Sequence, residues 1–519
     1  MARINTNVPS LIAQANLDRS GKDLSVHLER LSTGLRINRG KDDPAGLIIS
    51  ERIATDLAGI EQGIRNSERA SSVIATTEAA LVEISDLLNT IKGLTVEAAN
   101  SGAISDEEIE ANQLQINSAI QSITRISNTA TFGGLKLLDG SLDYITSGIN
   151  ASEIKTARVF AASFVGTNSQ QVEVDVLASA QKGALYLNGD MPGALTDGVL
   201  ASAVTIRVAG SKGVNELSFA SGTSLTNLVS SVNGRSALTG VEAVLINGDP
   251  NSGVIFRSVD YGSDEFVSVE RLGGDTSATW FETYKFADGL ELPDFAAGFP
   301  WAGIGTTLTS TNRDTGVDVQ ALINGSLANG DGLEVSLTSP NLSVELLLDE
   351  TFATDPAATT SVFDITGGGA LFQLGPEVNS LQQSSIGVQS VASENLGGSL
   401  VNGKLAFLNS LKSGQDNDIR SSASRNDFSQ ASDIIATSID DVSIMRGRLG
   451  AFERNTLSTN VRSLQAAYEN LTSSASVIRD ADFAVETSAL TRAQILNQAS
   501  TSVLALANQQ ASQVLSLLG

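Results

Sequence analysis

The sequence contains no cysteine, and His27 is the only histidine among its 519 residues. The chain therefore lacks the cysteines that thiol catalysis needs and the set of cysteines and histidines that a zinc site needs. Ser-His-Asp chemistry would depend on His27 alone. Because His27 lies between Leu24 and Leu28 in a helical pattern, we interpret it as a packing or surface residue. Disulfides are excluded, so an extracellular protein of this length relies on packing or assembly. We predict no enzymatic activity, no cofactor, and no catalytic, cofactor-binding or metal-binding residue.

Basic residues are scarce, with 33 Lys and Arg against 58 Asp and Glu and a net charge of −25. Nucleic acids and anionic membranes both bind basic surfaces, so we expect neither partner. No apolar stretch approaches the length of about 18 residues that a membrane-spanning helix needs, so we expect no membrane insertion. The first nine residues lack the charged start and apolar run of a Sec-type signal peptide, so export is expected by another route.

The middle of the chain is acidic and rich in turn residues. Residues 160–400 hold 27 acidic and 8 basic residues, seven of the nine prolines and both tryptophans. Short alternating runs at 204–208 and 333–337 are separated by Gly, Asn and Asp, which is typical of antiparallel strands. We predict one or two β-rich domains here, with the acidic residues forming a solvated face rather than an active site.

Both ends of the chain show heptad spacing instead. Leu24, Leu28, Leu31 and Leu35 step by four, three and four residues, and Leu464 and Leu471 belong to a second such series. This pattern predicts long coiled-coil helices. The predicted fold class is mainly α at both termini, as long paired coiled-coil helices with a small β-hairpin, plus a β-rich, α+β central insert of one or two outer domains.

The last 27 residues, 493–519, contain no charged side chain. Apolar residues recur there at helical spacing, and the other side is Gln, Asn, Ser and Thr. A solvated helix normally carries Lys and Glu, whereas a membrane helix does not tolerate so many amides. Burial among copies of the same helix fits better, and a terminal helix that caps a single globular core is the alternative. The apolar positions are Leu496, Val503, Leu506, Val514 and Leu517.

Two short polar motifs admit a functional interpretation. Asp416-Asn417-Asp418 could offer oxygens to calcium, but it lacks the glycine and distal glutamate of an EF-hand loop, so a polar turn is the better interpretation. Asn324-Gly325-Ser326 is a formal glycosylation acceptor, and Ser and Thr of the middle region are equally plausible sugar sites.

Several long motifs resemble bacterial flagellin. They are Ile4–Asn7, Leu31–Asn38, Lys41–Gly46 and Phe132–Leu138 near one end, and Ile478–Ala484 and Arg492–Asn508 near the other. They cover roughly residues 1–140 and 400–519 in the order the family has them. In the middle, 219–225 and 261–267 resemble a hook-IN-like motif, a repeat inserted in some flagellins and hook proteins.

The resemblance implies a structural subunit exported through the flagellar type III apparatus, which polymerises into the extracellular filament for swimming motility. It implies an inner coiled-coil layer of 1–43 with 476–519, a rod-like helical layer of 44–165 with 385–475, and variable surface-exposed β-rich domains at 166–384. The polymerisation or core seam is expected at Leu24, Leu28, Leu31, Leu35, Leu464, Leu471, Leu496, Val503, Leu506, Val514 and Leu517.

The implied partners are further copies in a helical homopolymer, a flagellar export chaperone, and the hook-associated and cap proteins. An innate immune flagellin receptor is expected to bind weakly, because receptor-sensed flagellins carry arginine at the position of Thr90 and an acid at that of Gly93. The equivalent receptor face is Leu88, Thr90, Lys92, Gly93 and Leu94. A hook–filament junction protein and a secreted coiled-coil adhesin or enzyme remain the alternative functions.

Overall fold

The computed structural model describes residues 6–516 apart from 101, 165–168, 191–196, 274–279, 287–300, 302–303, 305–306, 340, 356–359, 402–403 and 426. The chain forms two compact units, and helix α2 belongs partly to each. The first unit comprises residues 1–72, 372–383 and 451–519, and the second comprises 73–371 and 384–450. None of the described helices combines the length and hydrophobicity needed to cross a membrane.

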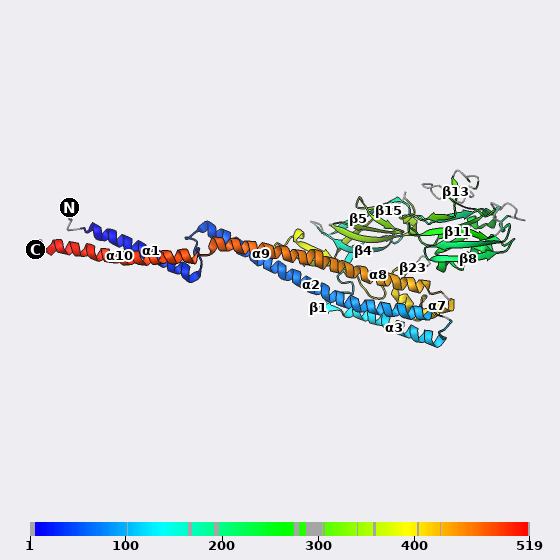
Figure 1. Ribbon diagram of the computed structural model, residues 1–519, viewed down its shortest axis with the longest axis horizontal. Helices are drawn as coiled ribbons and strands as arrows, with labels where there is room; N and C mark the ends of the chain where they lie inside the picture. The colour runs from blue at the N-terminus through cyan, green and yellow to red at the C-terminus, as the bar shows by residue number, and fades with distance from the viewer. Residues whose placement is uncertain are drawn as a thin grey trace. The chain divides into compact units, whose positions relative to one another are not determined.

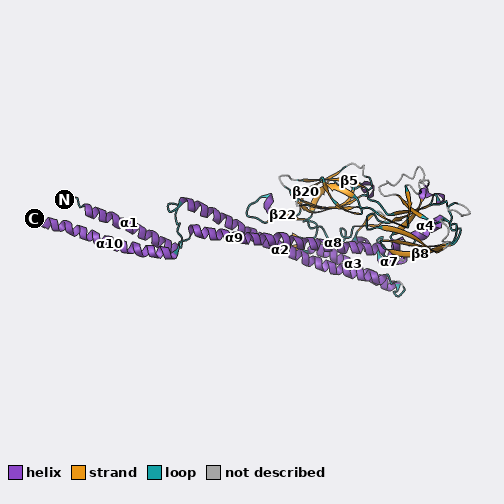
Figure 2. Cartoon of the chain, turned by 45° about the horizontal axis from the view of Figure 1, so that its top comes forward, coloured by secondary structure: helices purple, strands orange, loops and turns teal. Residues whose placement is uncertain are grey.

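The first unit is built from long helices, and α1 lies against α10 in both ribbon views (Figure 1, Figure 2). Helix α1 begins after Asn7, whose Oδ1 accepts a hydrogen bond from Ser10 N at 3.1 Å, and ends at Gly34 in the left-handed conformation (φ 72°). Glycine adopts that conformation without strain. The helical elements of this unit are α1 (Val8–Thr33), the start of α2 (Pro44–Ala98), α9 (Ser458–Arg479) and α10 (Phe483–Ser516).

Helix α2 follows a strict heptad pattern of buried residues. From Ile60 to Ala98, every position reached by alternating steps of three and four residues is buried. Leu81, Ile84, Leu88 and Ile91 are each 0% exposed. A seam of this regularity keeps one face against neighbouring helices over many turns.

A π-helical segment, Glu453–Leu457, connects α8 to α9. The buried residues Leu449 and Leu457 are eight positions apart, one more than a heptad. A π-turn absorbs one extra residue, so the seam continues in α9 despite the insertion.

Outside its sheets, the second unit contains the rest of α2, α3 (Asp106–Thr129), α7 (Ile419–Arg425) and most of α8 (Ser429–Phe452). A capping box begins α3, because Ser105 Oγ accepts from Glu108 N while Glu108 Oε2 accepts from Ser105 N. The strands β1 (Thr131–Phe132) and β2 (Leu135–Lys136) form a hairpin, whose turn residues Gly133 and Gly134 have φ of 59° and 88°. Positive φ at both turn positions is the geometry that a two-residue hairpin requires.

Two sheets of the second unit share one hydrophobic core. Its members include Phe363, Leu346 and Val174. The first sheet, in spatial order, is β16 (Ser326–Leu327), β15 (Gln320–Ile323), β5 (Gln170–Ala178), β20 (Ser361–Gly368) and β3 (Tyr144–Ser147). The second is β17 (Asn329–Asp331), β18 (Glu334–Thr338), β19 (Leu342–Leu348) and β4 (Ile154–Ala162), with α6 (Glu350–Ala353) following β19.

A second core is formed by two more antiparallel sheets and a helix, α4 (Leu225–Asn233). Helix α5 (Ser236–Thr239) follows α4 directly. One sheet is β13 (Leu308–Ser310), β12 (Thr283–Phe286), β6 (Ala184–Leu187), β10 (Val254–Ser258) and β9 (Val241–Leu245). The other is β14 (Arg313–Thr315), β11 (Phe266–Gly273), β7 (Val204–Gly210) and β8 (Gly213–Phe219). Strand β7 alternates buried and half-buried residues, as the sequence pattern at 204–208 predicts.

The side chain of Tyr144, on β3, links β4 to β22. Its hydroxyl donates to Ser385 Oγ at 2.8 Å and accepts from Ala162 N at 3.0 Å. The remaining paired strands are β21 (Ala370–Gln373) with β22 (Gln383–Ile386), and β23 (Ser399–Val401) with β24 (Lys404–Ala406). The predicted fold class is confirmed, with helical ends, a small hairpin and a β-rich insert.

Candidate assembly surface

The contact between α1 and α10 is a heptad seam made largely of small and polar residues. Buried and half-buried positions alternate by three and four residues along both helices. Asn7 Nδ2 donates to the carbonyl of Ala507 at 3.1 Å, and Ser10 Oγ donates to Asn508 Oδ1 at 2.8 Å. The seam residues are Ser10, Ala13, Leu17, Ser20, Leu24, His27 and Leu31 on α1, and Glu486, Leu490, Ala493, Asn497, Ser500, Leu504 and Ala507 on α10.

A charged group lies within this seam. Glu486 is 7% exposed, and its carboxylate lies 2.5 Å from His27 Nδ1 and 3.0 Å from Arg30 Nη1. Burial by itself raises the pKa of Glu486, but the hydrogen bonds from His27 and Arg30 outweigh it and hold the pKa below its usual range. The sequence analysis missed this pairing. An acid at a heptad position facing the only histidine was the available signal.

The apolar stripe of α10 lies on the other side of the helix. Leu496, Val503 and Leu506 are 51%, 55% and 56% exposed, while their neighbours Asn497, Ser500 and Leu504 face α1. An apolar stripe left outside its own core is the feature expected of a surface that another chain covers. The side chain of Val514 and the whole of Leu517 lie outside the described residues.

The other residues of the predicted seam have different degrees of burial. Leu24, Leu31 and Leu35 on the N-terminal side are half-buried, whereas Leu28 is 49% exposed. Leu464 and Leu471 are half-buried on α9. The structure therefore brings Leu24 and Leu31 together with α10, and it leaves Leu28 and the α10 stripe open to solvent.

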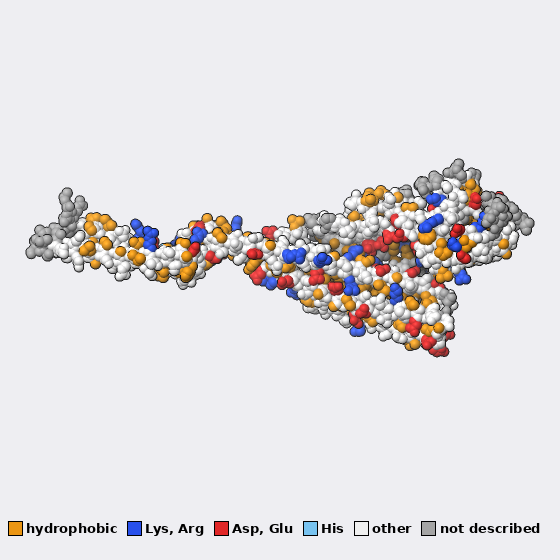
Figure 3. All heavy atoms as spheres, viewed as in Figure 1, with side chains coloured by type: hydrophobic (Ala, Val, Ile, Leu, Met, Phe, Trp, Pro, Cys, Tyr) orange, Lys and Arg blue, Asp and Glu red, His pale blue; other side chains and the backbone are white. Residues whose placement is uncertain are grey.

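Charge is distributed very unevenly between the two units. The first unit holds 14 basic and 15 acidic residues, whereas the second holds 19 basic and 43 acidic residues. Figure 3 shows few acidic side chains along the terminal helices on the face in view. Like-charge repulsion between copies is therefore weak for the first unit and strong for the second.

A glycine pair on α2 holds a segment that is distant in sequence. A Cβ on Gly59 would lie 2.8 Å from Pro376 Cβ, and one on Gly63 would lie 2.8 Å from the carbonyl oxygen of Leu374. Asn66 Nδ2 donates to the Gln373 carbonyl at 3.1 Å, which fixes the same segment. The sequence analysis missed this site, although Gly59 and Gly63 are one helical turn apart and form a small-residue pair on one helix face.

The receptor-equivalent residues divide between two sides of α2. Leu88 is 0% exposed and Leu94 is half-buried, whereas Thr90, Lys92 and Gly93 are exposed. A Cβ added to Gly93 would meet no atom within 4 Å. The polar face is therefore accessible and can accept larger side chains.

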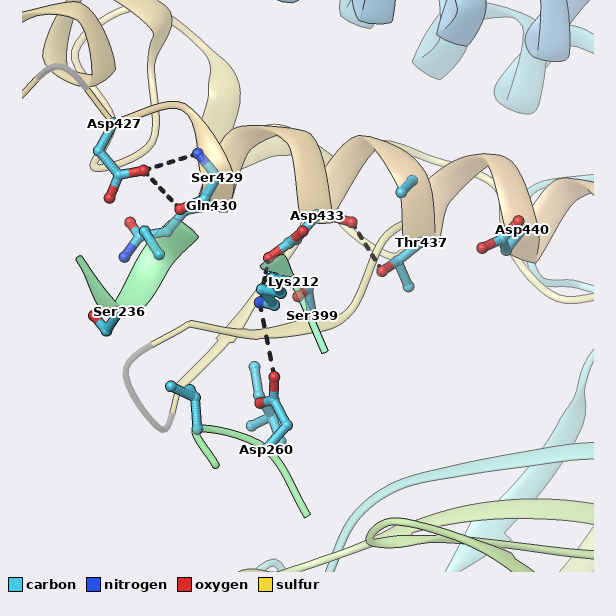
Figure 4. Close-up of a pocket in the computed structure, with 14 residues that line it drawn as sticks. Lys212, Ser236, Asp260, Ser399, Asp427, Ser429, Gln430, Asp433, Thr437 and Asp440 are labelled. Atoms are coloured by element: carbon cyan, nitrogen blue, oxygen red, sulfur yellow. Dashed lines mark hydrogen bonds and ion pairs between the residues drawn. The ribbon is translucent and has the colours of Figure 1, made fainter. Parts of the chain in front are cut away.

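A cavity of about 480 Å³ lies in the second unit between Lys212 and the side of α8 (Figure 4). Lys212 Nζ lies 3.3 Å from Asp433 Oδ2 and 3.7 Å from Asp260 Oδ2. Burial by itself lowers the pKa of Lys212, but the two carboxylates outweigh it and raise the pKa above its usual range. A lysine held as a cation is a poor nucleophile, and within the described part of the chain no acidic or histidine cluster could hold a metal ion.

A second ionic cluster connects the first core to α8. Arg158 Nη1 lies 2.7 Å from Asp441 Oδ1 and 3.3 Å from Glu345 Oε1, and Arg448 Nη2 lies 3.5 Å from Glu345 Oε2. Burial, and next the negative charge of Glu345, raise the pKa of the nearby Glu334 to about 7. This cluster holds the sheet β17–β18–β19–β4 against the helix.

The remaining polar motifs have structural roles. Asp418 Oδ2 accepts from Gly414 N at 2.8 Å and Asp418 Oδ1 from Ser421 N at 2.7 Å, so the carboxylate ties a turn to the start of α7. Asn324 Oδ1 accepts from Glu173 N at 2.8 Å, and Asn324 Nδ2 donates to the Gln171 carbonyl at 3.2 Å. Both bonds hold the amide of Asn324 against β5.

Comparison with known proteins gives full-length matches. Residues 4–143 match the family described as the bacterial flagellin N-terminal helical region, and residues 432–518 match the bacterial flagellin C-terminal helical region. The chain is 30% identical over 540 residues to a flagellin of Salmonella budapest and 29% identical over 527 residues to one of Salmonella typhimurium. Both alignments cover 99% of this chain and 99% of the relative.

Among solved structures, the flagellar hook associated protein-3 of Legionella pneumophila is similar at 11% identity and a TM-score of 0.29. That match covers 82% of this chain and 97% of the other. No conclusion rests on a similarity this weak.

Proposed function

The chain belongs to the bacterial flagellin family and is a structural subunit of the flagellar filament, and we propose that the exposed apolar stripe of α10 is the surface by which copies of its terminal helices pack together. The observation that carries the proposal is the exposure of Leu496, Val503 and Leu506 on a helix whose other side already packs on α1. Burying these side chains between copies releases hydrophobic free energy that an isolated chain forgoes.

The near-neutral charge of the first unit supports the same proposal. Many copies can approach closely only where their mutual repulsion is small, and the first unit differs by one between its basic and acidic residues. A heterologous contact repeated without closure produces a filament. The proposed layers are 1–43 with 476–519 inside, 44–165 with 385–475 around them, and 166–384 facing the medium.

Further parts of the proposal concern location, partners and activity. Because the chain belongs to the family, we place it in the extracellular filament. We expect its partners to be a flagellar export chaperone and the hook-associated and cap proteins. We assign the chain no enzymatic activity. The hook-IN-like motif at 219–225 and 261–267 is proposed as an inserted repeat, and the innate receptor is proposed to bind weakly through the face around Thr90 and Lys92.

The test compares two triple variants of the full chain in seeded polymerisation. Replacing Leu496, Val503 and Leu506 by Ser should abolish filament growth while the chain stays folded. Replacing Ile145, Leu177 and Leu327 by Ser is the matched control, because these side chains are similarly exposed, at 62%, 52% and 66%, on the β-rich part. Normal filament length from the α10 variant would reject the proposed surface.

A further inference from the structure

A short loop of the first unit, residues 375–382, carries two aliphatic side chains that the rest of the chain barely covers. Val378 and Leu381 are each 88% exposed, more than any other large hydrophobic residue among those described. The loop projects beside β22 and connects it to β21 (Figure 2). Single exposed aliphatic side chains are ordinary, but two at the tip of one projecting loop are typical of a contact surface.

The loop is fixed by its own hydrogen bonds. Gln382 Oε1 accepts from Glu377 N at 2.7 Å, and Gln373 Nε2 donates to the carbonyls of Gly375 at 2.9 Å and Glu377 at 2.7 Å. Asn379 Oδ1 accepts from Gln382 N at 3.0 Å. Because the loop is ordered without a partner, little conformational entropy is lost when its tip becomes buried.

The base of the loop is attached to the helices of the first unit. Leu374 is 7% exposed, and its carbonyl accepts from Asn460 Nδ2 of α9 at 2.9 Å. Gly59 and Gly63 of α2 receive Pro376 and Leu374 closely, as described above. The base of the loop is therefore attached directly to α2 and α9.

We propose that Val378 and Leu381 are a contact between copies, in which the loop of one chain docks on the helical surface of the first unit of a second chain. The inference rests on the proposed assembly through the first unit. Copies related by a repeated heterologous contact place different surfaces of the same unit against each other, so a projecting apolar tip on that unit meets a neighbour.

Charge indicates which surface of the second copy receives the tip. The loop contains Glu377 beside the two aliphatic residues and no basic residue. The second unit, with 43 acidic and 19 basic residues, repels Glu377. The helices of the first unit carry exposed residues of both signs, such as Arg52 beside Glu51 and Arg69 beside Glu68 on α2, so they repel Glu377 far less.

The first experiment measures the critical concentration for seeded polymerisation of full-length chains. Replacing Val378 and Leu381 by Ser should raise it about tenfold or more, because each side chain loses its burial free energy at the contact. Replacing Ile145 and Leu327 by Ser removes two comparably exposed aliphatic residues from the second unit and should leave it unchanged.

The second experiment places a photo-reactive amino acid at position 381 in filaments assembled from mixed heavy-isotope and normal chains. Crosslinks between heavy and normal chains that map to the first unit are the expected result. Crosslinks confined to one chain, or a critical concentration unchanged in the Val378/Leu381 variant, overturn the inference while leaving assembly through α10 intact. Failure of the unmodified chain to polymerise on seeds instead rejects the proposed function itself.

Discussion

His27 Nδ1 lies 2.5 Å from Glu486 Oε2, and the contact joins residues 459 positions apart in the sequence. The carboxylate also accepts from Arg30 Nη1 at 3.0 Å, so one acid of α10 holds two side chains of α1. This arrangement fixes which turn of α10 lies opposite which turn of α1. The leucine, alanine and serine residues of the rest of the seam offer little to distinguish one heptad register from the next.

Glu486→Gln should therefore weaken the pairing of α1 with α10 by about 1–2 kcal/mol, since it leaves Arg30 and His27 beside a neutral amide. Faster hydrogen exchange of the α1 amides in the monomer measures the loss. Glu469→Gln, on the exposed side of α9, is the control.

The pairing of α1 with α10 should also depend on pH. Because the folded pKa of Glu486 lies below its ordinary value of 4.5, the stability that Glu486 contributes is present above pH 4.5 and is lost as pH falls further. The Gln variant should lack that dependence. Equal exchange in all three chains would contradict the prediction.

The raised pKa of Glu334 predicts the opposite pH dependence for the stability of the second unit. The folded pKa of Glu334 is raised from 4.5 to about 7, so between these values the unfolded chain has lost a proton that the folded chain retains. Stability therefore falls as pH rises through this window. Burial also raises the pKa of Asp143, to about 6, and adds a change of the same sign.

Urea unfolding monitored by tryptophan fluorescence measures this effect, because Trp280 and Trp301 both belong to the second unit. We expect the free energy of unfolding to be about 1–3 kcal/mol lower at pH 8 than at pH 5. Glu334→Gln should remove most of the difference, whereas Glu216→Gln, an exposed carboxylate of β8, should preserve it. A pH-independent midpoint in the unmodified chain would show that Glu334 stays ionised.

Two glycines of α2 should respond oppositely to alanine. Gly63→Ala places a Cβ 2.8 Å from the Leu374 carbonyl oxygen and 3.1 Å from Leu464 Cδ1, so it should destabilise the first unit by about 1–3 kcal/mol. Gly93→Ala meets open space and should stabilise the helix by about 1 kcal/mol. Thermal unfolding followed by far-UV circular dichroism compares the two variants. A stabilised Gly63→Ala chain would mean that residues 374–376 move away at no cost.

The receptor face gives a prediction about host recognition. Thr90 and Gly93 are exposed on α2, so Thr90→Arg with Gly93→Glu alters the polar face without disturbing the buried Leu88. An arginine supplies directed donors and is often an interface hot spot worth about 2 kcal/mol or more. The double variant should activate a flagellin-receptor reporter cell more strongly than the unmodified monomer, with Gly93→Ala alone as the control. Full potency of the unmodified monomer would contradict this interpretation of the face.

The sequence by itself determined the helical ends, the strands and several local features. Heptad spacing predicts buried positions on α2 because a 3.5-residue repeat allows only one continuous face, and Leu81, Ile84, Leu88 and Ile91 follow it. The capping box of Ser105 and Glu108 could likewise be recognised, because its partners are three residues apart. Such features depend on neighbours along the chain.

Only the tertiary structure decided which face of α10 meets α1, and which residues meet across long separations. The apolar stripe of α10 is the obvious seam in the sequence, yet α1 packs on the side of Asn497 and Ser500. Apolar residues occur on both faces of α10, with Leu490 and Leu504 facing α1, so either face can pack and the choice depends on the partner. The pairs Glu486 with His27 and Gly63 with Leu374 have the same origin, because each contact exists only after distant segments have been brought together.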